Sequence, residues 1–268
     1  MVDLWRTLRV HLPLSIRPAA LVSDQPGADK NDHLAPSLPT DFLVEHLTED
    51  ETTALSRVAS KHSVMVNDLL LRDFFLMLAA WNRGTSEERG PLRIMIPTNM
   101  RRREDSRMPA ANVFSYAFIT RFASACAGRE QLLKSISLNM ATIKRDNLGL
   151  YYEAGLRLLC RFPAFVRWSL NRRWAFATAV FTNLGSAFDS MPLPSTDRHK
   201  LAGDLILESG AGAGPIRPDT RVSFSAHSYA GRLSIGARCD PQIFTPLQQR
   251  ALLNSYVDHL RMTLELQS

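Results

Sequence analysis

The sequence contains no run of eighteen apolar residues, so we expect no membrane-spanning helix. Its first 22 residues are interrupted by Arg6, Arg9 and Pro13, which break the continuous apolar core that a signal peptide needs. The three cysteines lie far apart and form no CxxC pair. This spacing argues against a disulfide framework and a zinc site, and it fits a reducing compartment. We therefore expect a cytoplasmic protein without a bound metal.

Positive charge is in moderate excess, with 32 Lys and Arg against 26 Asp and Glu and a formal net charge of +6. The arginines are scattered, apart from one tight run at Arg101, Arg102 and Arg103. Because no nucleic-acid-binding module accompanies this run, we expect no nucleic-acid partner. A basic surface suits an acidic partner, such as an acyl carrier protein with its phosphopantetheine, a CoA phosphate or an anionic membrane face. A solvated basic exterior explains the excess equally well.

One stretch has the composition of a linker. Residues 23–40 are rich in proline, aspartate and serine, and the residues before them form a short amphipathic stretch. No internal repeat is visible. We therefore divide the chain into an N-terminal segment with its linker, residues 1–40, and a folded body, residues 41–268.

Helix signals recur along the folded body. Thr48 with Glu51, and Thr245 with Gln248, have the spacing of a capping box, which predicts that a helix begins after each threonine. Apolar periodicity predicts three more helices: one that opens at Ser63 or Asn67 and is apolar on most sides, one over residues 128–145, and one over residues 151–175 that breaks before Pro163.

Strand signals alternate with these helices. Strands are predicted over residues 42–47, 92–97, 113–120, 178–182, 204–207, 221–229 and 232–237. The last two alternate apolar and polar residues and meet at Ala230-Gly231, which is typical of a hairpin. Because the order lacks the strict βαβ alternation of a Rossmann fold, the sequence predicts a mixed-sheet α/β sandwich lobe.

Several short segments, in this order, resemble the second lobe of the chloramphenicol acetyltransferase-like superfamily. This superfamily of CoA-dependent acyltransferases includes condensation domains, alcohol acetyltransferases and wax ester synthases. VNDLL at residues 66–70 is similar to a helix start of the family, IPTNMR at 96–101 to a strand end, and FTNLG at 181–185 to its SNxxG segment. Residues 223–264 resemble its closing hairpin and helix. The resemblance assigns structural or tunnel-lining roles to Asn67, Asp68, Arg101, Asn112, Thr182, Asn183 and Gly185.

The resemblance implies a two-lobed transferase with a tunnel between the lobes. The acyl group would pass from a CoA or phosphopantetheine thioester to an alcohol or amine. In the family, an HHxxxDG motif in the first lobe supplies the general base, and its aspartate pairs with an arginine of the second lobe. On this sequence that arginine would be Arg101.

HHxxxDG occurs nowhere in the sequence, so we assign no catalytic residue. We expect a second lobe that is inactive alone, with a first lobe on a separate chain or lost. Such a lobe would expose an apolar face, which predicts a partner chain or a homo-oligomer. The alternative is a non-catalytic module that binds an acyl chain or a carrier protein.

A few other residues have patterns that could indicate a site. His46 and Asp50 have H-x-x-x-D spacing, but the capping box at Thr48 accounts for that segment. Ser225 and His227 share one strand face, which would line the tunnel or face solvent. The glycine-rich loop at residues 210–215 opens no helix and lacks the lysine of a phosphate-binding loop.

The mixed arginine and aromatic residues between 155 and 181 fit either a peripheral membrane contact or a helix packed on the sheet.

Overall fold

The computed structural model describes residues 7, 14, 17–24, 42–101, 104–105, 108, 113–164, 167, 175–186, 188–189, 191–216 and 219–266. Its main sheet has six strands in the order β1-β9-β8-β4-β2-β3. These are β1 (Phe42–His46), β9 (Arg232–Cys239), β8 (Val222–Tyr229), β4 (Ala179–Asn183), β2 (Pro91–Asn99) and β3 (Phe114–Phe122). β4 is parallel to both β2 and β8, and the other neighbours are antiparallel.

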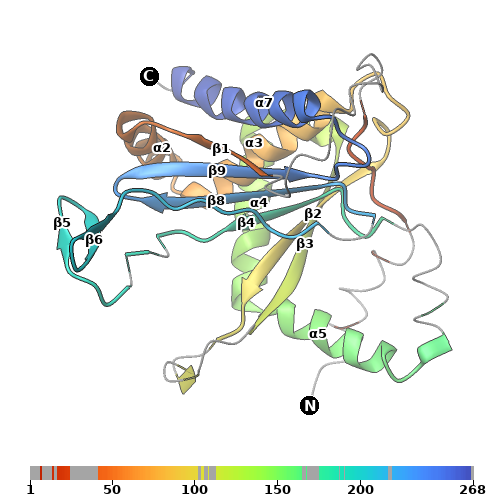
Figure 1. The fold of residues 1–268 in the computed structure, drawn as a ribbon. Helices are drawn as coiled ribbons and strands as arrows, with labels where there is room; N and C mark the ends of the chain where they lie inside the picture. Colours follow the sequence, from red (N-terminus) through yellow and green to blue (C-terminus); the bar gives the residue numbers. More distant parts are fainter. Residues whose placement is uncertain are drawn as a thin grey trace.

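Helices cover one face of this sheet (Figure 1). They are α2 (Glu49–Lys61), α3 (Val66–Trp81), α4 (Arg129–Arg145) and α7 (Pro246–Glu265), while α5 (Leu148–Leu159) lies beyond the other face beside β3. α3 packs against α2, α4 and α7, and Leu70, Leu71 and Phe75 are completely buried. The predicted α/β sandwich lobe with a central apolar helix is therefore confirmed.

An aromatic cluster joins the central helix to the sheet. The ring of Phe74 lies 5.1 Å from that of Phe181 on β4, 4.9 Å from Phe224 on β8 and 5.2 Å from Tyr256 on α7, between centroids. Tilted and edge-on pairs of this kind each contribute about 0.5–1.5 kcal/mol beyond the area they bury. Four elements from distant parts of the sequence are thus held at one point.

Both predicted capping boxes are present. Thr48 and Thr245 are the N-caps of α2 and α7, and each exchanges hydrogen bonds with the residue three positions later. His46 ends β1, where its Nδ1 lies 2.8 Å from Ser234 Oγ. The H-x-x-x-D spacing therefore spans a strand end and a helix start, as the capping box predicts. The hairpin at Ala230-Gly231 is also confirmed, and both residues have positive φ, 49° and 81°.

Two elements differ from the sequence prediction. α5 begins at Leu148, three residues early, and it ends at Leu159, before the predicted break at Pro163. A second, three-stranded sheet is formed by β5 (Ser195–Thr196), β6 (His199–Ala202) and β7 (Leu205–Leu207), of which only β7 was predicted. β5 and β6 are too short and too polar to show apolar alternation, so backbone pairing defines them.

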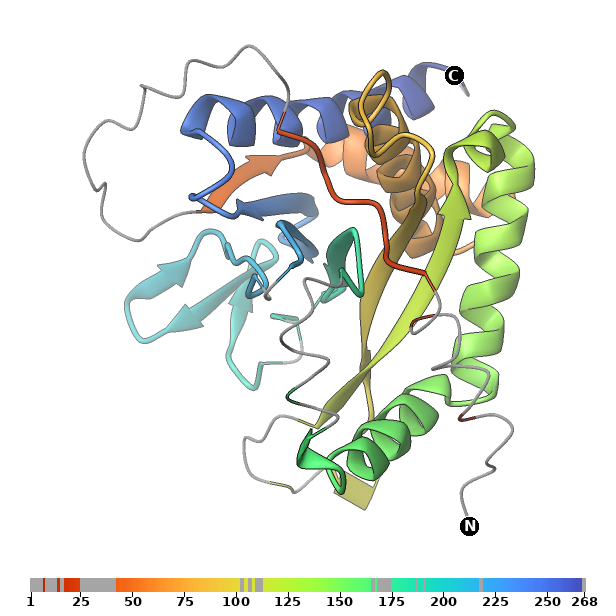
Figure 2. The ribbon, with the colours of Figure 1, turned by 90° about the vertical axis from the view of Figure 1, so that its right-hand side faces the viewer.

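Residues 17–24 lie along the body of the lobe (Figure 2). Ala20 and Val22 belong to the main core, and Trp81 Nε1 donates to the carbonyl oxygen of Ser23 at 2.9 Å. Buried Arg93 donates to the carbonyl oxygen of Arg17 at 3.2 Å. This part of the predicted N-terminal segment thus contributes to the core. Residues 25–41 lie outside the described residues, so the boundary at residue 41 stays a prediction.

A buried ionic cluster fastens α3 to α7. Arg72 donates to both carboxylate oxygens of Asp73, at 2.8 and 3.0 Å, and Thr263 on α7 donates to the same carboxylate at 2.8 Å. Arg129, at the start of α4, lies 3.6 Å from it. Asp73 is completely buried, and this burial raises the pKa of its carboxyl against the opposing hydrogen bonds from Arg72 and Thr263.

Within the described residues, no helix combines the length and apolarity needed to cross a bilayer.

Candidate functional site

Three parallel strands bring most of the residues assigned by resemblance to one edge of the sheet. β2, β4 and β8 run in the same direction, and ligand sites in open α/β sheets form at the carboxyl ends of such strands. β2 pairs with β4 only at Ile94 and Met95, and beyond these residues β2 and β3 bend away from β4 (Figure 1). Arg101 follows the end of β2, Asn183 ends β4, and His227 lies near the end of β8. We call this region the carboxyl edge.

Asn183 connects two of the resemblance segments directly. Its Nδ2 lies 3.2 Å from Oδ1 of Asn67, in the first turn of α3, although 116 residues separate the two in sequence. Its Oδ1 accepts a hydrogen bond from the backbone N–H of Gly185 at 2.9 Å. Gly185 has φ +59°, a conformation that a side chain disfavours. The turn after β4 is thus fixed by Asn183 and anchored to the helix.

Asp68 has a local structural role. Its side chain is 3% exposed, and its Oδ2 accepts the backbone N–H of Met65 at 3.2 Å, at the start of α3. An acidic residue in the first helical turn also interacts favourably with the helix dipole. Asp68 therefore stabilises the helix end that presents Asn67 to the carboxyl edge.

Arg101 lies at the carboxyl edge with its side chain exposed. Its backbone N–H donates to Oδ1 of Asn99 at 2.9 Å, which closes the turn after β2. An exposed arginine here can meet an acidic group from outside, but its pairing with a motif aspartate stays a prediction. Asn112, which the resemblance also assigned, lies outside the described residues.

The sheet face opposite the helices carries a row of polar side chains. Ser225, His227 and Tyr229 alternate along β8 and bond to carbonyl oxygens of Gly212, Gly210 and Leu207, respectively. The Tyr229 hydroxyl donates at 2.6 Å and also accepts the backbone N–H of Lys200 at 2.8 Å. The loop at residues 207–214 therefore runs antiparallel across β8. We call these three bonds the polar ladder.

Glycines allow this loop to lie directly on the sheet. A Cβ atom on Gly236, in β9, would overlap the carbonyl oxygen of Gly212 and lie 2.6 Å from Ser225 Oγ. A Cβ atom on Gly214 would lie 2.5 Å from Ser223 Oγ. The glycine-rich loop thus serves close packing, and no helix follows it that could cradle a phosphate.

The geometry of His227 rules out one of its two predicted orientations. The side chain is only 2% exposed, so the solvent-facing alternative is wrong. Its Nε2 bonds to a carbonyl oxygen, which can only accept, so Nε2 carries the proton and cannot act as a base. Ser225 donates to the loop rather than to His227, and the two form no catalytic dyad.

Thr182 and Ser223 extend the polar face toward the middle of the sheet. Thr182, on β4, pairs in register with Ser225. Ser223 Oγ is completely buried and has no hydrogen-bond partner among the described residues. A buried hydroxyl without a partner carries a desolvation cost of about 1–3 kcal/mol. Because Gly214 packs directly against it, this hydroxyl is enclosed by the loop.

The described residues contain no cluster of metal-ligating side chains, and two of the three thiols are buried. No group of three or more His, Cys, Asp or Glu residues comes together there. Burial raises the pKa of the Cys126 thiol to about 11 and that of Cys239 to about 12. Because the thiolate is the nucleophile, both side chains are inert at neutral pH.

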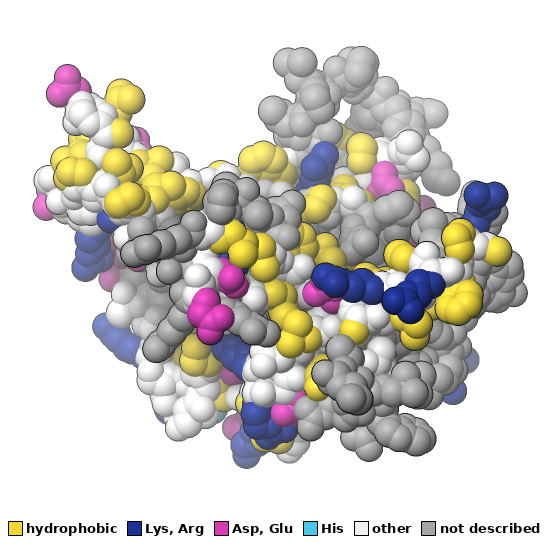
Figure 3. All heavy atoms as spheres, turned by 90° about the horizontal axis from the view of Figure 1, so that it is seen from below, with side chains coloured by type: hydrophobic (Ala, Val, Ile, Leu, Met, Phe, Trp, Pro, Cys, Tyr) yellow, Lys and Arg dark blue, Asp and Glu magenta, His cyan; other side chains and the backbone are white. Residues whose placement is uncertain are grey.

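Apolar side chains are exposed on the same side of the molecule. Figure 3 looks onto the side away from the helix layer, where hydrophobic side chains gather on a projecting part and near the centre. Leu205 and Ile206 on β7 are 73% and 59% exposed, and Leu184, beside the carboxyl edge, is 54% exposed. We call Leu184, Leu205 and Ile206, together with exposed Met191 and Leu193, the apolar flap surface.

Comparison with known proteins places the fold. No family model matches the sequence, and no curated protein matches it. The epimerization domain from the third module of tyrocidine synthetase B is similar over 98% of this chain and 56% of its own, with 19% identity and a TM-score of 0.60. A holo four-domain nonribosomal peptide synthetase bound to AMP and glycine is similar over 99% of this chain and 20% of its own, with 15% identity and a TM-score of 0.62.

The first condensation domain of the CDA synthetase is also similar, over 86% of this chain and 46% of its own, with 14% identity and a TM-score of 0.55. The fold is therefore that of a condensation-domain lobe. The chain spans 56% or less of each of these three structures.

Proposed function

We propose that this chain is the second lobe of a condensation-type acyltransferase. The observation that carries the proposal is the contact between Asn183 and Asn67 at the carboxyl edge, which joins elements that the sequence separates widely, while Arg101 is exposed after the end of β2. The likeness to condensation and epimerization domains supports it at the level of the fold. An acyl or aminoacyl group would pass from a CoA or carrier-protein thioester to an amine or an alcohol.

The described side chains would position the reaction rather than perform its proton transfer. Asn183 fixes the turn after β4, and the exposed Arg101 would hold an acidic group of the partner lobe. The proton of the attacking amine or hydroxyl must go to a general base, and the thiol leaves with the electron pair of the C–S bond. His227 cannot take that proton at Nε2. Its ring is 2% exposed beneath the loop, so the base would come from HHxxxDG on the first lobe.

The apolar flap surface supports a partner for this lobe. Leu205 and Ile206 project from a small sheet that makes few contacts with the rest of the lobe. Covering apolar side chains releases about 25 cal/mol per Å² of area removed from water. We propose that a first lobe covers this surface. A second copy of the chain is the other occupant consistent with an apolar patch.

A non-catalytic binding module is the second candidate. It is favoured by the polar ladder, which occupies the hydrogen-bonding groups of Ser225 and His227 within the lobe. In this case the lobe would hold an acyl chain or a carrier protein without chemistry. α5 offers a surface for this, because Leu156 and Leu158 are exposed beside Arg157. A peripheral membrane contact at this helix also stays a proposal.

A reconstitution experiment tests the transferase proposal. The chain is mixed with a separately produced first lobe that carries HHxxxDG, and complex formation is followed by analytical ultracentrifugation. Thiol release from an acyl-CoA or acyl-N-acetylcysteamine is measured with an amine acceptor present. We expect a complex and thiol release from the mixture. The chain alone should stay at background, because loss of a general base costs about 10²–10⁴-fold in rate.

Variants separate the possible outcomes. Arg101→Ala should slow the mixture, whereas Arg57→Ala, on the exposed side of α2, should not. If the chain alone released thiol and His227→Ala abolished this, the active site would lie under the loop and the proposal would fail. A complex without thiol release would favour the binding module.

A further inference from the structure

A cavity of about 730 Å³ lies on the helical side of the lobe, away from the carboxyl edge. It is lined by the second half of α3, the loop that follows, the short 3₁₀ helix η2 (Ala123–Cys126) and α7. The cavity begins at Leu76, and Asn67 is in the first turn of the same helix. Since α3 rises about 1.5 Å per residue, the nine residues from Asn67 to Leu76 separate the two regions by roughly 13 Å along the helix.

Three arginines and a histidine line this cavity. Arg83 and Arg89 lie in the loop after α3, Arg129 begins α4, and His259 is on α7, while Glu88 is the acidic residue among the described lining residues. Glu88 accepts the backbone N–H of Gly84 at 2.9 Å. In the described part of the chain, Arg83 and Arg89 make no ion pair with it or with another acid. Their charges are therefore free for a ligand.

Arg129 adds positive charge that the protein does not neutralise. Its Nη2 donates to Thr263 Oγ1 at 3.0 Å and lies 3.6 Å from Asp73. The same carboxylate already bonds to Arg72 through both oxygens. Two guanidinium groups thus share one carboxylate, and neither can lose its proton. One unit of positive charge is left over, and Arg129 is the partly exposed member, on the cavity wall.

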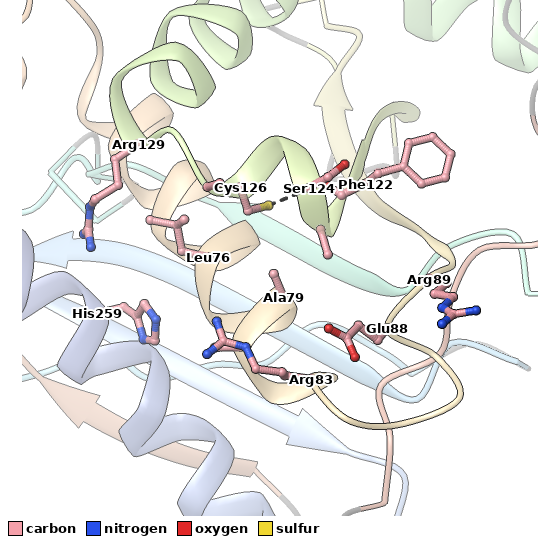
Figure 4. A pocket seen from close by; sticks show the side chains of 13 residues that line it. Leu76, Ala79, Arg83, Glu88, Arg89, Phe122, Ser124, Cys126, Arg129 and His259 are labelled. Atoms are coloured by element: carbon pink, nitrogen blue, oxygen red, sulfur yellow. Dashed lines mark hydrogen bonds between the residues drawn. The ribbon is translucent and has the colours of Figure 1, made fainter.

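His259 is oriented by a contact within α7. Its Nδ1 lies 2.8 Å from the carbonyl oxygen of Ser255, one turn earlier on α7. A carbonyl oxygen only accepts, so Nδ1 carries a proton and the Ser255 contact fixes the ring orientation, while the arginines supply the donors for a ligand. Figure 4 shows His259, Arg83 and Arg129 on one side of the cavity around Leu76, with Glu88 and Arg89 on the other side. The arginines therefore flank an apolar floor.

The floor is formed by Leu76, Ala79, Phe122 and Cys126. A cavity of this size falls in the range of small-molecule sites, about 300–1,000 Å³. Guanidinium groups match the oxygens of phosphate through paired N–H donors. We infer that this cavity binds a small organic phosphate of the nucleoside diphosphate type, with phosphate at the arginines and the apolar part against the floor. The site does not depend on the proposed transferase function.

Calorimetric titration of the whole chain tests the inference with three ligands. ADP carries both parts, pyrophosphate only the anionic part, and adenosine only the uncharged part. We expect ADP to bind more tightly than pyrophosphate, and adenosine to bind at least tenfold more weakly than ADP. Binding of adenosine as tightly as ADP would overturn the inference, and so would a dissociation constant for ADP above about 1 mM, the range of weak contacts.

Matched arginine variants locate the site. Arg83→Gln and Arg89→Gln should each weaken ADP binding about tenfold, the effect of losing one charge-assisted hydrogen bond. Arg57→Gln removes an exposed arginine from α2, outside the cavity, and should leave binding unchanged. Thermal melting of each variant checks that the fold is retained. Equal weakening by all three variants would mean that ADP senses only the net charge, and the assigned site would be wrong.

Discussion

Replacing Gly236 by alanine should dislodge the loop that covers the sheet. Gly236 lies in β9, and its φ is outside the positive range, so alanine suits the backbone there. The added Cβ atom would instead overlap the carbonyl oxygen of Gly212 and lie 2.6 Å from Ser225 Oγ. To restore an ordinary C···O contact, the loop must move by about 1 Å. That movement breaks the hydrogen bond between Ser225 and Gly212.

The expected loss of stability follows from two opposing effects. Overpacking costs about 1–3 kcal/mol, and the broken hydrogen bond adds about 1 kcal/mol. Reduced freedom of the unfolded chain returns about 0.4–1 kcal/mol. We expect Gly236→Ala to lower the free energy of unfolding by about 1–3 kcal/mol. Gly212→Ala is the matched control, because a Cβ atom there meets nothing within 4 Å and φ is not positive.

Two measurements decide the matter. Urea unfolding followed by circular dichroism gives the change in free energy for each variant. Labelling with diethyl pyrocarbonate, mapped by mass spectrometry, reports access to His227, which is 2% exposed. We expect His227 to be labelled faster in Gly236→Ala than in wild type or Gly212→Ala. If Gly236→Ala unfolded like Gly212→Ala and His227 stayed protected, the loop would not rest on this contact and the reasoning would be refuted.

Two further substitutions probe charged groups. Asp73→Ala leaves Arg72 buried without its carboxylate, so urea unfolding should show the free energy of unfolding lowered by about 3–5 kcal/mol. A decrease below about 1 kcal/mol would contradict the stabilising role of the buried cluster. Arg101→Ala removes an exposed side chain and should shift the free energy of unfolding in the isolated chain by at most about 1 kcal/mol. A much larger shift in the same assay would show that Arg101 is a structural residue.

Local signals predicted most of the fold. The capping boxes at Thr48 and Thr245 and the Ala230-Gly231 turn act over a few residues, so the sequence displays them directly. β5 and β6 were missed because their pairing is the only interaction that defines such short polar strands. The buried ionic cluster around Asp73 was not predicted, because its partner Thr263 lies 190 residues away in the sequence.

The candidate site was predictable only in part. The resemblance identified Asn67 and Asn183 separately, and the fold brings them within hydrogen-bonding distance. The sequence contains only a weak indication that a loop covers His227. Glycine at every second position of residues 210–214 permits close packing on the sheet. Periodicity on β8 alone could not distinguish a side chain facing solvent from one facing a loop. The difference depends on the path of residues 207–214, which no local pattern encodes.

The polar ladder restricts where a partner or substrate can act on this lobe. Over β8, the loop occupies the hydrogen-bonding groups of Ser225, His227 and Tyr229. What stays accessible is the carboxyl edge with Arg101 and the apolar flap surface with Leu205. The carboxyl edge offers a charged side chain and the apolar flap surface offers apolar area, and protein interfaces combine the two. His227 is 2% exposed beneath this loop, so a partner can approach the lobe at the carboxyl edge and at the apolar flap surface but not over this part of β8.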